Sequence, residues 1–346
     1  MSLIRIISFI LILFSYQSLV SQVGGENVFN FLNLSTSSRQ IALGGEVLTL
    51  RDDVNQSIWN PSTININLHK QLAVNYTNFI AGISIGSVSY AYEIDRRVGV
   101  LQANIQYLNY GTLIESDENG LEIGTFNASD FALSVGYAYN FPKTNFYIGS
   151  NLRFITSSIS NFTSTGFSLD FGVSYFSEFK PYSFTLVVRN LGTQIQPFEF
   201  EKEEIPLKIS LGIDYKLEHV PLKWYLTLDN LQQWDISEPN PSKSETDFEG
   251  NITEEDISFF TNAIKHFVIG AELLPEKAIN LRLGYNFRRA SELQLQNART
   301  FSGISFGFGI RMNKLKFNYA FSKYHSASNA STFSLQIDLD KRRDNE

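Results

Sequence analysis

Apolar and polar residues alternate with a period of two along most of the chain after residue 70. In the clearest run, 304–310, a bulky apolar residue occupies every second position. Because successive side chains of an extended strand point to opposite faces, this run has one bulky apolar face and one face of small residues. The small face consists of Gly303, Ser305, Gly307 and Gly309. We identify fourteen alternating segments: 71–79, 82–93, 97–110, 126–140, 144–158, 165–177, 181–191, 205–217, 221–232, 264–273, 278–288, 301–312, 315–323 and 331–339.

The lengths of these segments and of their connections predict the fold. The segments suit tilted membrane-spanning strands of about 9–11 residues, whereas strands of soluble sheets, such as those of a sandwich, are usually about 5–6 residues long. Short connections alternate with longer ones at 111–125, 192–204, 233–263 and 289–300, although the first, near residues 80–81, is also short. Outer-membrane barrels have short periplasmic turns and longer outer loops. The chain is therefore predicted to be all-β, a monomeric transmembrane antiparallel β-barrel of 14 strands (71–340) with both termini in the periplasm.

The first seventy residues lack this alternation. Residues 1–21 have the apolar stretch and small final residues of a secretory signal peptide. Residues 22–70 are interrupted by Gly, Asp and Asn-Pro breaks but keep apolar anchors, which predicts a hatch or plug inside the barrel. Residues 341–346 form a charged tail. The candidates for filling the space beside the small face of 303–309 are Gly44, Gly45, Trp59, Asn60 and Pro61.

Composition excludes several classes of protein. The net charge of -7 and the absence of a basic patch exclude nucleic acid as a partner. After the first twenty residues no apolar run reaches the roughly 18 residues that a spanning helix needs. The chain contains no Cys, so it has neither a disulfide nor a lipid-accepting thiol. These features predict an exported bacterial protein embedded in outer-membrane lipid.

Charged residues of both signs fall on the inward parity of the strands. Such residues either pair with one another and with a plug, or line an ion-selective pore, which more often carries one dominant sign. They are Arg153, Asp170, Arg189, Lys208, Asp214, Lys216, Asp229, Glu272, Arg282, Arg311 and Lys316.

Catalytic and metal-binding motifs are weak. The Gly-x-Ser-x-Gly pattern occurs around Ser84 and Ser305, but both lie within predicted strands and not on the strand-turn-helix elbow that exposes a nucleophile. The four His are scattered, without metal-ligand spacing. The acidic stretch 233–263 lacks the spaced oxygen ligands of a calcium loop, so a solvated loop is the simpler interpretation. We expect no enzymatic activity, no metal and no cofactor.

Several motifs resemble the PorQ family, barrel proteins of the type IX secretion system of Bacteroidetes. The similarity covers essentially the whole mature chain. Its elements include Phe29-Asn30-Phe31-Leu32, Ser37 to Gly45, Asp52-Asp53-Val54-Asn55, Trp59-Asn60-Pro61 and Arg189 to Gln194. The Leu-Gly-Gly and Asn-Pro elements are shared more loosely with PorV and with FadL-like fatty-acid transporters, in which Asn-Pro-Ala stands where this chain has Asn60-Pro61-Ser62.

The resemblance implies a function as well as a fold. A PorQ-like barrel would anchor a PorZ-like surface protein, within an assembly that contains PorU and PorV, for cargo carrying a sorting domain. The alternative is a FadL-like transporter of hydrophobic small molecules, for which we expect an apolar pocket near the hatch. The sequence does not show which loops would bind a partner.

Overall fold

The computed structural model describes residues 27–79, 82–95, 98–177, 179–236, 245–246, 252–253, 258–293, 301–325 and 328–340. The predicted signal peptide, residues 1–21, and the charged tail, residues 341–346, lie outside the described residues. No helix among the described residues is long and apolar enough to span a membrane.

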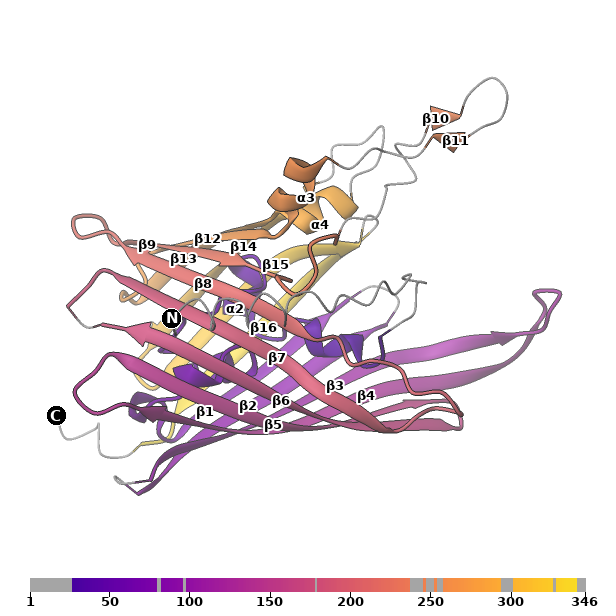
Figure 1. Ribbon diagram of the computed structural model, residues 1–346, viewed down its shortest axis with the longest axis horizontal. Coiled ribbons are helices and arrows are strands. Elements are labelled where there is room, and N and C mark those ends of the chain that lie inside the picture. The colour runs from indigo at the N-terminus through magenta and orange to yellow at the C-terminus, as the bar shows by residue number, and fades with distance from the viewer. Residues whose placement is uncertain are drawn as a thin grey trace, which may run out of the picture.

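The described residues form one closed barrel of fourteen antiparallel strands (Figure 1). Each strand pairs with its neighbours in the chain, and β1 closes the barrel by pairing with β16 from Gln71↔Asp338 to Asn78↔Ser331. The prediction of a closed fourteen-stranded antiparallel barrel is thus confirmed. The barrel strands are β1 (Gln71–Asn78), β2 (Ser84–Asp95), β3 (Gly99–Ser116), β4 (Glu122–Asn140), β5 (Phe146–Ile159), β6 (Phe162–Phe176), β7 (Tyr182–Gln196), β8 (Lys208–Lys216), β9 (Leu222–Leu228), β12 (Phe267–Leu273), β13 (Ile279–Asn286), β14 (Ile304–Met312), β15 (Leu315–His325) and β16 (Ser328–Asp338).

The two ends of the barrel differ. The connections that follow the even-numbered strands of the barrel are short, such as the Asn313-Lys314 turn between β14 and β15. They lie at what we call the short-turn end. The longer excursions lie at the opposite, long-loop end, where β3 and β4 reach far beyond their neighbours (Figure 1). The helices α3 (Phe259–Lys265) and α4 (Phe287–Glu292) and the small hairpin of β10 (Glu245–Thr246) and β11 (Ile252–Thr253) also belong to the long-loop end.

Several expected boundaries are wrong. The expected loop 111–125 is mostly strand, because β3 and β4 continue their pairing past a bulge between Asn109 and Thr112 as far as Ser116↔Glu122. Segments 264–273 and 278–288 were expected to be strand throughout, but α3 occupies the start of the first and α4 begins at Phe287 in the second. Caps account for both helices, since the side chains of Ser258 and Asn286 accept hydrogen bonds from the N–H groups of Thr261 and Arg289.

Along the strands, apolar side chains face outward and polar side chains face inward. On β6, Phe167, Phe171 and Val173 are 41–42% exposed, whereas Ser168 and Asp170 are buried. On β14, Phe306 is 48% exposed and Ser305 is buried. A barrel with a continuous apolar exterior and a polar interior matches the architecture of outer-membrane barrels.

The segment before β1, residues 27–70, lies inside the barrel and is called here the internal segment. Its short helices are η1 (Asn30–Asn33), α2 (Ser38–Ala42), η2 (Val54–Ile58), η3 (Pro61–Thr63) and η4 (Ile66–Leu68). Nearly every residue from Val28 to Ile64 is buried, and the indigo ribbon of this segment is enclosed by the strands in Figure 1. Hydrogen bonds tie the segment to the wall, as where Ser38 N donates to Ser334 Oγ at 2.9 Å.

Candidate functional site

Glycines of the barrel wall make room for the backbone of the internal segment. A Cβ built on Gly149 of β5 would lie 2.3 Å from the Pro61 carbonyl carbon, and one on Gly284 of β13 would lie 2.1 Å from Gly44 N. Distances this short mean that no larger residue fits without moving the backbone. The close approach thus depends on the absence of side chains at these wall positions.

The Trp59-Asn60-Pro61 motif is held by β5, β6 and β7. Asn60 Nδ2 donates to Thr185 Oγ1 at 2.9 Å and to the Leu48 carbonyl oxygen at 2.8 Å. Its Oδ1 accepts from Ser62 N at 3.0 Å, which caps η3. The guanidinium of Arg189 stacks over the Trp59 ring, 4.0 Å from its centroid. This motif therefore does not face β14, where we had expected it to fill the space beside Gly303, Ser305, Gly307 and Gly309.

The small face of β14 meets several different groups. A Cβ on Gly307 would lie 2.7 Å from Ala42 Cβ of the internal segment, whereas one on Gly303 would meet Ala290 of α4. A Cβ on Gly309 would meet the side-chain amides of Asn280 and Asn318. Ser305 is buried against the same interior. Only Gly307 of the three glycines therefore lies against the internal segment in these contacts.

Gly44 and Gly45 occupy backbone conformations that glycine favours. Their φ angles are 104° and 102°, and Gly44 lies against Val268 of β12 and Gly284 of β13. Gly45 lies beside the side chains of Arg289 and Ser35. The turn after α2 consequently packs on β12 and β13, of which only β13 pairs with β14.

Ion pairs of Arg39 hold the internal segment together and join it to the wall. Arg39 bridges Asp52 at 2.7 Å and Glu272 at 2.8 Å, and Glu272 also accepts from Arg282 Nε at 2.7 Å. Burial alone would raise the pKa of Asp52, but the charge of Arg39 and then that of Lys316 lower it well below its usual range. Asp52 is therefore ionised near neutral pH and pairs with Arg39 within the internal segment, while Glu272 joins Arg39 to the wall.

The other inward charges form separate groups. Arg153 pairs with Asp170 at 2.7 Å, and Lys208 pairs with Asp229 at 2.5 Å and with Glu46 of the internal segment at 3.1 Å. Asp214 accepts from Lys223 at 3.1 Å. Lys216, in contrast, is exposed and pairs with Glu276, while Arg311 and Lys316 border a cavity at the short-turn end.

An apolar pocket lies between the internal segment and the inner wall at the long-loop end. Its volume is about 370 Å³, within the range of small-molecule sites. It is continuous with a core cluster that includes Phe31, Ile85 and Leu108. Two lining residues, Asn30 and Asn329, are exposed, so the pocket reaches the surface. The lining consists of Asn30, Phe31, Leu34, Phe79, Ile83, Leu108, Tyr110, Tyr324, Asn329 and Ala330.

Two tyrosines give this pocket a limited polar edge. Tyr110 Oη donates to Asp130 Oδ2 at 2.7 Å, and the ring of Tyr324 packs edge-on against Phe79 at 5.4 Å between centroids. The guanidinium of Arg289 also lies over the Tyr324 ring, 4.3 Å from its centroid. The Tyr324 hydroxyl is buried and has no hydrogen-bond partner among the described residues.

These pocket residues do not stand out from the alternation of the strands, although the sequence contains one signal of the pocket. In the alternating segment 82–93, Ile83 and Ile85 lie on the same face as the inward Ser87 and Ser89. The apolar-polar alternation of this segment is therefore weak. The structure shows Ile85 buried within the lumen, beside inward Leu108. The break in the pattern marks the point at which the inner wall changes from polar to apolar.

The serines of the two Gly-x-Ser-x-Gly patterns both lie on barrel strands, Ser84 at the start of β2 and Ser305 in β14. Within the described ranges, no group of three or more His, Cys, Asp and Glu side chains is arranged to hold a metal ion. Two His side chains instead contact the backbone: His69 Nδ1 accepts from Glu93 N at 2.9 Å, and His266 Nδ1 lies 2.6 Å from the Asp229 carbonyl oxygen.

Comparison with solved structures identifies outer-membrane barrels of the FadL type. The toluene transporter TbuX of Ralstonia pickettii has a TM-score of 0.52 at 11% identity, covering 90% of this chain and 100% of its own. The monoaromatic hydrocarbon channel TodX, in a mutant form, has a TM-score of 0.49 at 13% identity, with 89% and 98% of the two chains covered. A Pseudomonas aeruginosa FadL homologue has a TM-score of 0.49 at 11% identity, with coverage of 88% and 99%.

At these identities the likeness establishes the fold alone, which is that of FadL-like outer-membrane barrels. No protein-family model matches the sequence, and no curated protein matches it. The resemblance to the PorQ family consequently has no support from these comparisons.

Proposed function

We propose that this protein is an outer-membrane transporter of small hydrophobic molecules. The observation that carries the proposal is the apolar pocket, which opens at the long-loop end and is bounded on one side by η1 of the internal segment. An apolar pocket near the internal segment is the feature that distinguishes transport from anchoring. The FadL-like fold supports the same choice, because its structural neighbour TbuX is described as a toluene transporter.

The arrangement favours capture of a small apolar molecule from the long-loop side. Phe31 and Leu108 are almost completely buried and supply the apolar lining, and an apolar molecule that leaves water for such a lining gains about 25 cal/mol for each Å² of buried apolar surface. Below the pocket the internal segment fills the lumen, so passage requires part of that segment to move. Residues of η1 border the pocket directly, whereas Arg39 and Asp52 are fixed by ion pairs deeper in the barrel.

A polar substitution in the pocket tests this proposal. We expect Leu108→Asn to weaken binding of toluene by the purified barrel about tenfold or more, since it places an amide in the apolar lining. Toluene binding is measured by saturation-transfer NMR in detergent, and uptake by cells that express the variant. Ile155→Asn is the matched control, because Ile155 belongs to the same buried cluster but does not line the pocket.

If both variants lose binding equally, the loss reflects damage to the shared core. If Leu108→Asn binds and transports toluene as well as the unmodified protein, the transport proposal is wrong. Heat-modifiable migration on a denaturing gel verifies that each variant has formed the barrel.

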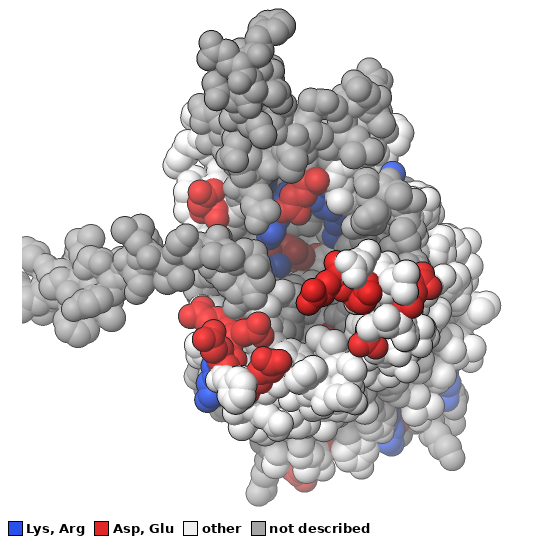
Figure 2. Space-filling view, turned by 90° about the vertical axis from the view of Figure 1, so that its right-hand side faces the viewer, with Lys and Arg blue, Asp and Glu red and all other residues white. Residues whose placement is uncertain are grey.

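The second candidate function is anchoring of a PorZ-like surface protein. This anchoring would take place in an assembly that contains PorU and PorV. The observation in its favour is the β3–β4 hairpin, which projects from the long-loop end (Figure 1) and exposes Ile114, Leu121 and Ile123 by 59–68%. Exposed apolar side chains on a projecting element are typical of contact surfaces. Figure 2 shows acidic side chains around the opening at this end, with basic and acidic side chains together deeper within it.

A pulldown from the outer membrane separates the two candidates. Recovery of a large surface protein with the tagged barrel, together with loss of surface cargo in a deletion strain, supports anchoring. Unchanged surface cargo in a strain that no longer takes up an apolar nutrient supports transport.

A further inference from the structure

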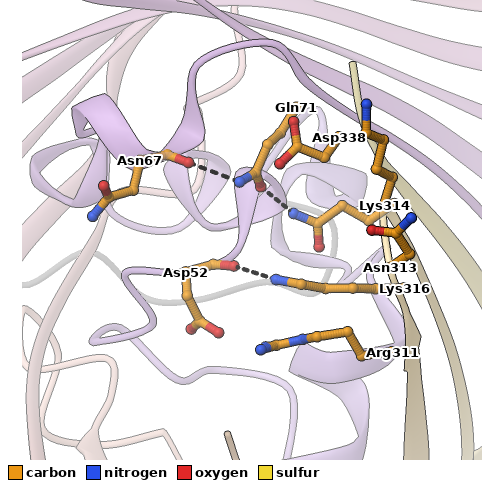
Figure 3. Close-up of a pocket in the computed structure, with 9 residues that line it drawn as sticks. Asp52, Asn67, Gln71, Arg311, Asn313, Lys314, Lys316 and Asp338 are labelled. Atoms are coloured by element: carbon orange, nitrogen blue, oxygen red, sulfur yellow. Dashed lines mark hydrogen bonds between the residues drawn. The ribbon is translucent and has the colours of Figure 1, made fainter. Parts of the chain in front are cut away.

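A second cavity lies at the short-turn end, at the opposite end of the barrel from the apolar pocket. Its volume is about 370 Å³, and its lining is polar and charged. The internal segment supplies Asp52 and Asn67, and the wall supplies Arg311, Lys316 and Gln336 from β14, β15 and β16. Figure 3 shows Arg311 and Lys316 extending side by side from the wall toward Asp52.

The two cations occupy directly opposed positions on neighbouring strands. Arg311 pairs with Lys316 in the β14–β15 register, so both side chains leave the same face of the sheet. Like charges directly opposite each other destabilise a sheet. The repulsion between Arg311 and Lys316 inside the barrel therefore needs a compensating negative charge nearby.

The described residues do not supply that charge by direct pairing. Neither Arg311 nor Lys316 forms an ion pair with a described carboxylate. Lys316 Nζ donates only to the main-chain oxygen of Asp52, at 3.3 Å, and Arg311 Nε is buried without a partner.

The carboxylates that border the cavity have other contacts. The Asp52 carboxylate accepts from Arg39 Nη1 at 2.7 Å, and Asp338 Oδ1 accepts from the Asp340 backbone N–H at 3.0 Å. The Gln71 and Gln336 side-chain amides are hydrogen-bonded to each other, and Gln71 Nε2 also donates to the Asn67 carbonyl oxygen at 2.7 Å (Figure 3). The cavity therefore presents two cationic donor groups that form no ion pair with a described carboxylate, and the one carboxylate that they approach, that of Asp52, is already paired with Arg39.

We propose that this cavity binds an oxyanion, a carboxylate or a phosphate, between Arg311 and Lys316. A guanidinium offers two parallel N–H donors that match either anion, and an ammonium adds a point charge beside it. The anion would neutralise the opposed pair and satisfy Arg311. It has two sources, a carboxylate at the end of a hydrophobic chain or phosphate dissolved in the surrounding water.

Titration of the purified full-length barrel with inorganic phosphate tests the site. We expect saturable binding by isothermal titration calorimetry in phosphate-free detergent, and a loss of affinity of at least about tenfold in the double variant R311Q/K316Q, as expected when charge-assisted hydrogen bonds are removed. Lys316→Arg keeps the charge and should retain binding. Lys216→Gln is the matched control, since it removes a cation at the same end that does not line the cavity.

Competition separates the two sources of the anion. Octanoate that displaces bound phosphate supports a site that also accepts carboxylates, whereas octanoate that leaves phosphate bound supports a phosphate site. Absence of phosphate binding, or equal binding by R311Q/K316Q, overturns the proposal. Leu108→Asn should leave phosphate binding unchanged, so failure of the transport proposal is distinguishable from failure of this one.

Discussion

At the scale of single residues, Glu272 is the acidic partner shared by two cations. Its carboxylate contacts Arg39 of the internal segment and Arg282 of β13, and the side chain has no exposure to solvent. Tyr225 Oη also donates to it, at 3.0 Å. Because a buried charge that loses its partner is left uncompensated, Glu272 links the internal segment to the wall more strongly than an exposed pair could.

We therefore expect Glu272→Gln to lower the free energy of unfolding by about 3–5 kcal/mol. The measurement is urea unfolding of the barrel in lipid vesicles, followed by tryptophan fluorescence. The control is Glu276→Gln, since Glu276 is 75% exposed beside Lys216 and such pairs contribute about 0–1 kcal/mol. Equal effects of the two variants would contradict the role of the buried pair.

A substitution at Gly149 of β5 tests whether the internal segment packs directly against the barrel wall. A Cβ at this position meets the backbone of Pro61 and Ser62 at 2.3–2.4 Å, so we expect Gly149→Ala to displace η3 and to lower stability by about 1–3 kcal/mol, as overpacked cores do. Hydrogen exchange of the internal segment provides the measurement. Gly86→Ala on β2 is the control, because its Cβ would have an ordinary contact of 3.6 Å. Unchanged exchange around Pro61 in Gly149→Ala would refute the steric argument.

At the scale of elements, the β3–β4 hairpin is separable from the barrel. Beyond the bulge at Asn109 and Thr112, the two strands pair only with each other up to Ser116↔Glu122, since β2 pairs with β3 no further than Asn109 and β5 pairs with β4 from Ala128 onward. The projecting part therefore contributes no pairing to barrel closure. An apolar tip on such an extension suggests contact with something outside the barrel.

We expect a variant in which an Asn-Gly turn joins Thr112 to Asn127 to retain the closed barrel. Two-residue turns of this type suit hairpins, and Thr112 and Asn127 are already paired. Heat-modifiable migration measures closure, and the pulldown described above measures partner recovery. A partner recovered as well by this variant as by the full chain would rule out the hairpin as its docking surface.

The elements also show how far sequence patterns reach. The number of strands and their inward and outward faces followed from alternation, because a period of two is a local property of an extended chain. The boundaries of α3 and α4 could not be predicted from alternation, because a short helix at the end of a strand depends on a single cap such as Asn286. The length of the β3–β4 hairpin was underestimated because a bulge shifts the parity and the pattern then resembles a loop.

At the scale of the whole molecule, closure brings distant segments together. The closed wall surrounds the internal segment, so that Ser334 of β16 lies beside Ser38 and the cations of β14 and β15 lie beside Asp52. Both pockets lie between this segment and the wall, so neither exists in any single element. Ligand recognition is therefore expected to depend on the assembled barrel and its internal segment together.

Strand alternation and turn spacing are encoded residue by residue, so the closed fourteen-stranded barrel with an apolar exterior and a polar lumen was predictable from the sequence alone. The sequence also indicated that charged residues such as Arg153, Asp170 and Glu272 face inward, although Lys216 is exposed. Three contacts became visible only in the folded barrel: Trp59 to Pro61 meet β5 to β7, Glu272 joins Arg39 to Arg282, and Phe31 and Leu108 line a pocket. The physical reason is that such contacts depend on which parts of the wall and the internal segment closure brings together, and local periodicity carries no information about distances across the lumen.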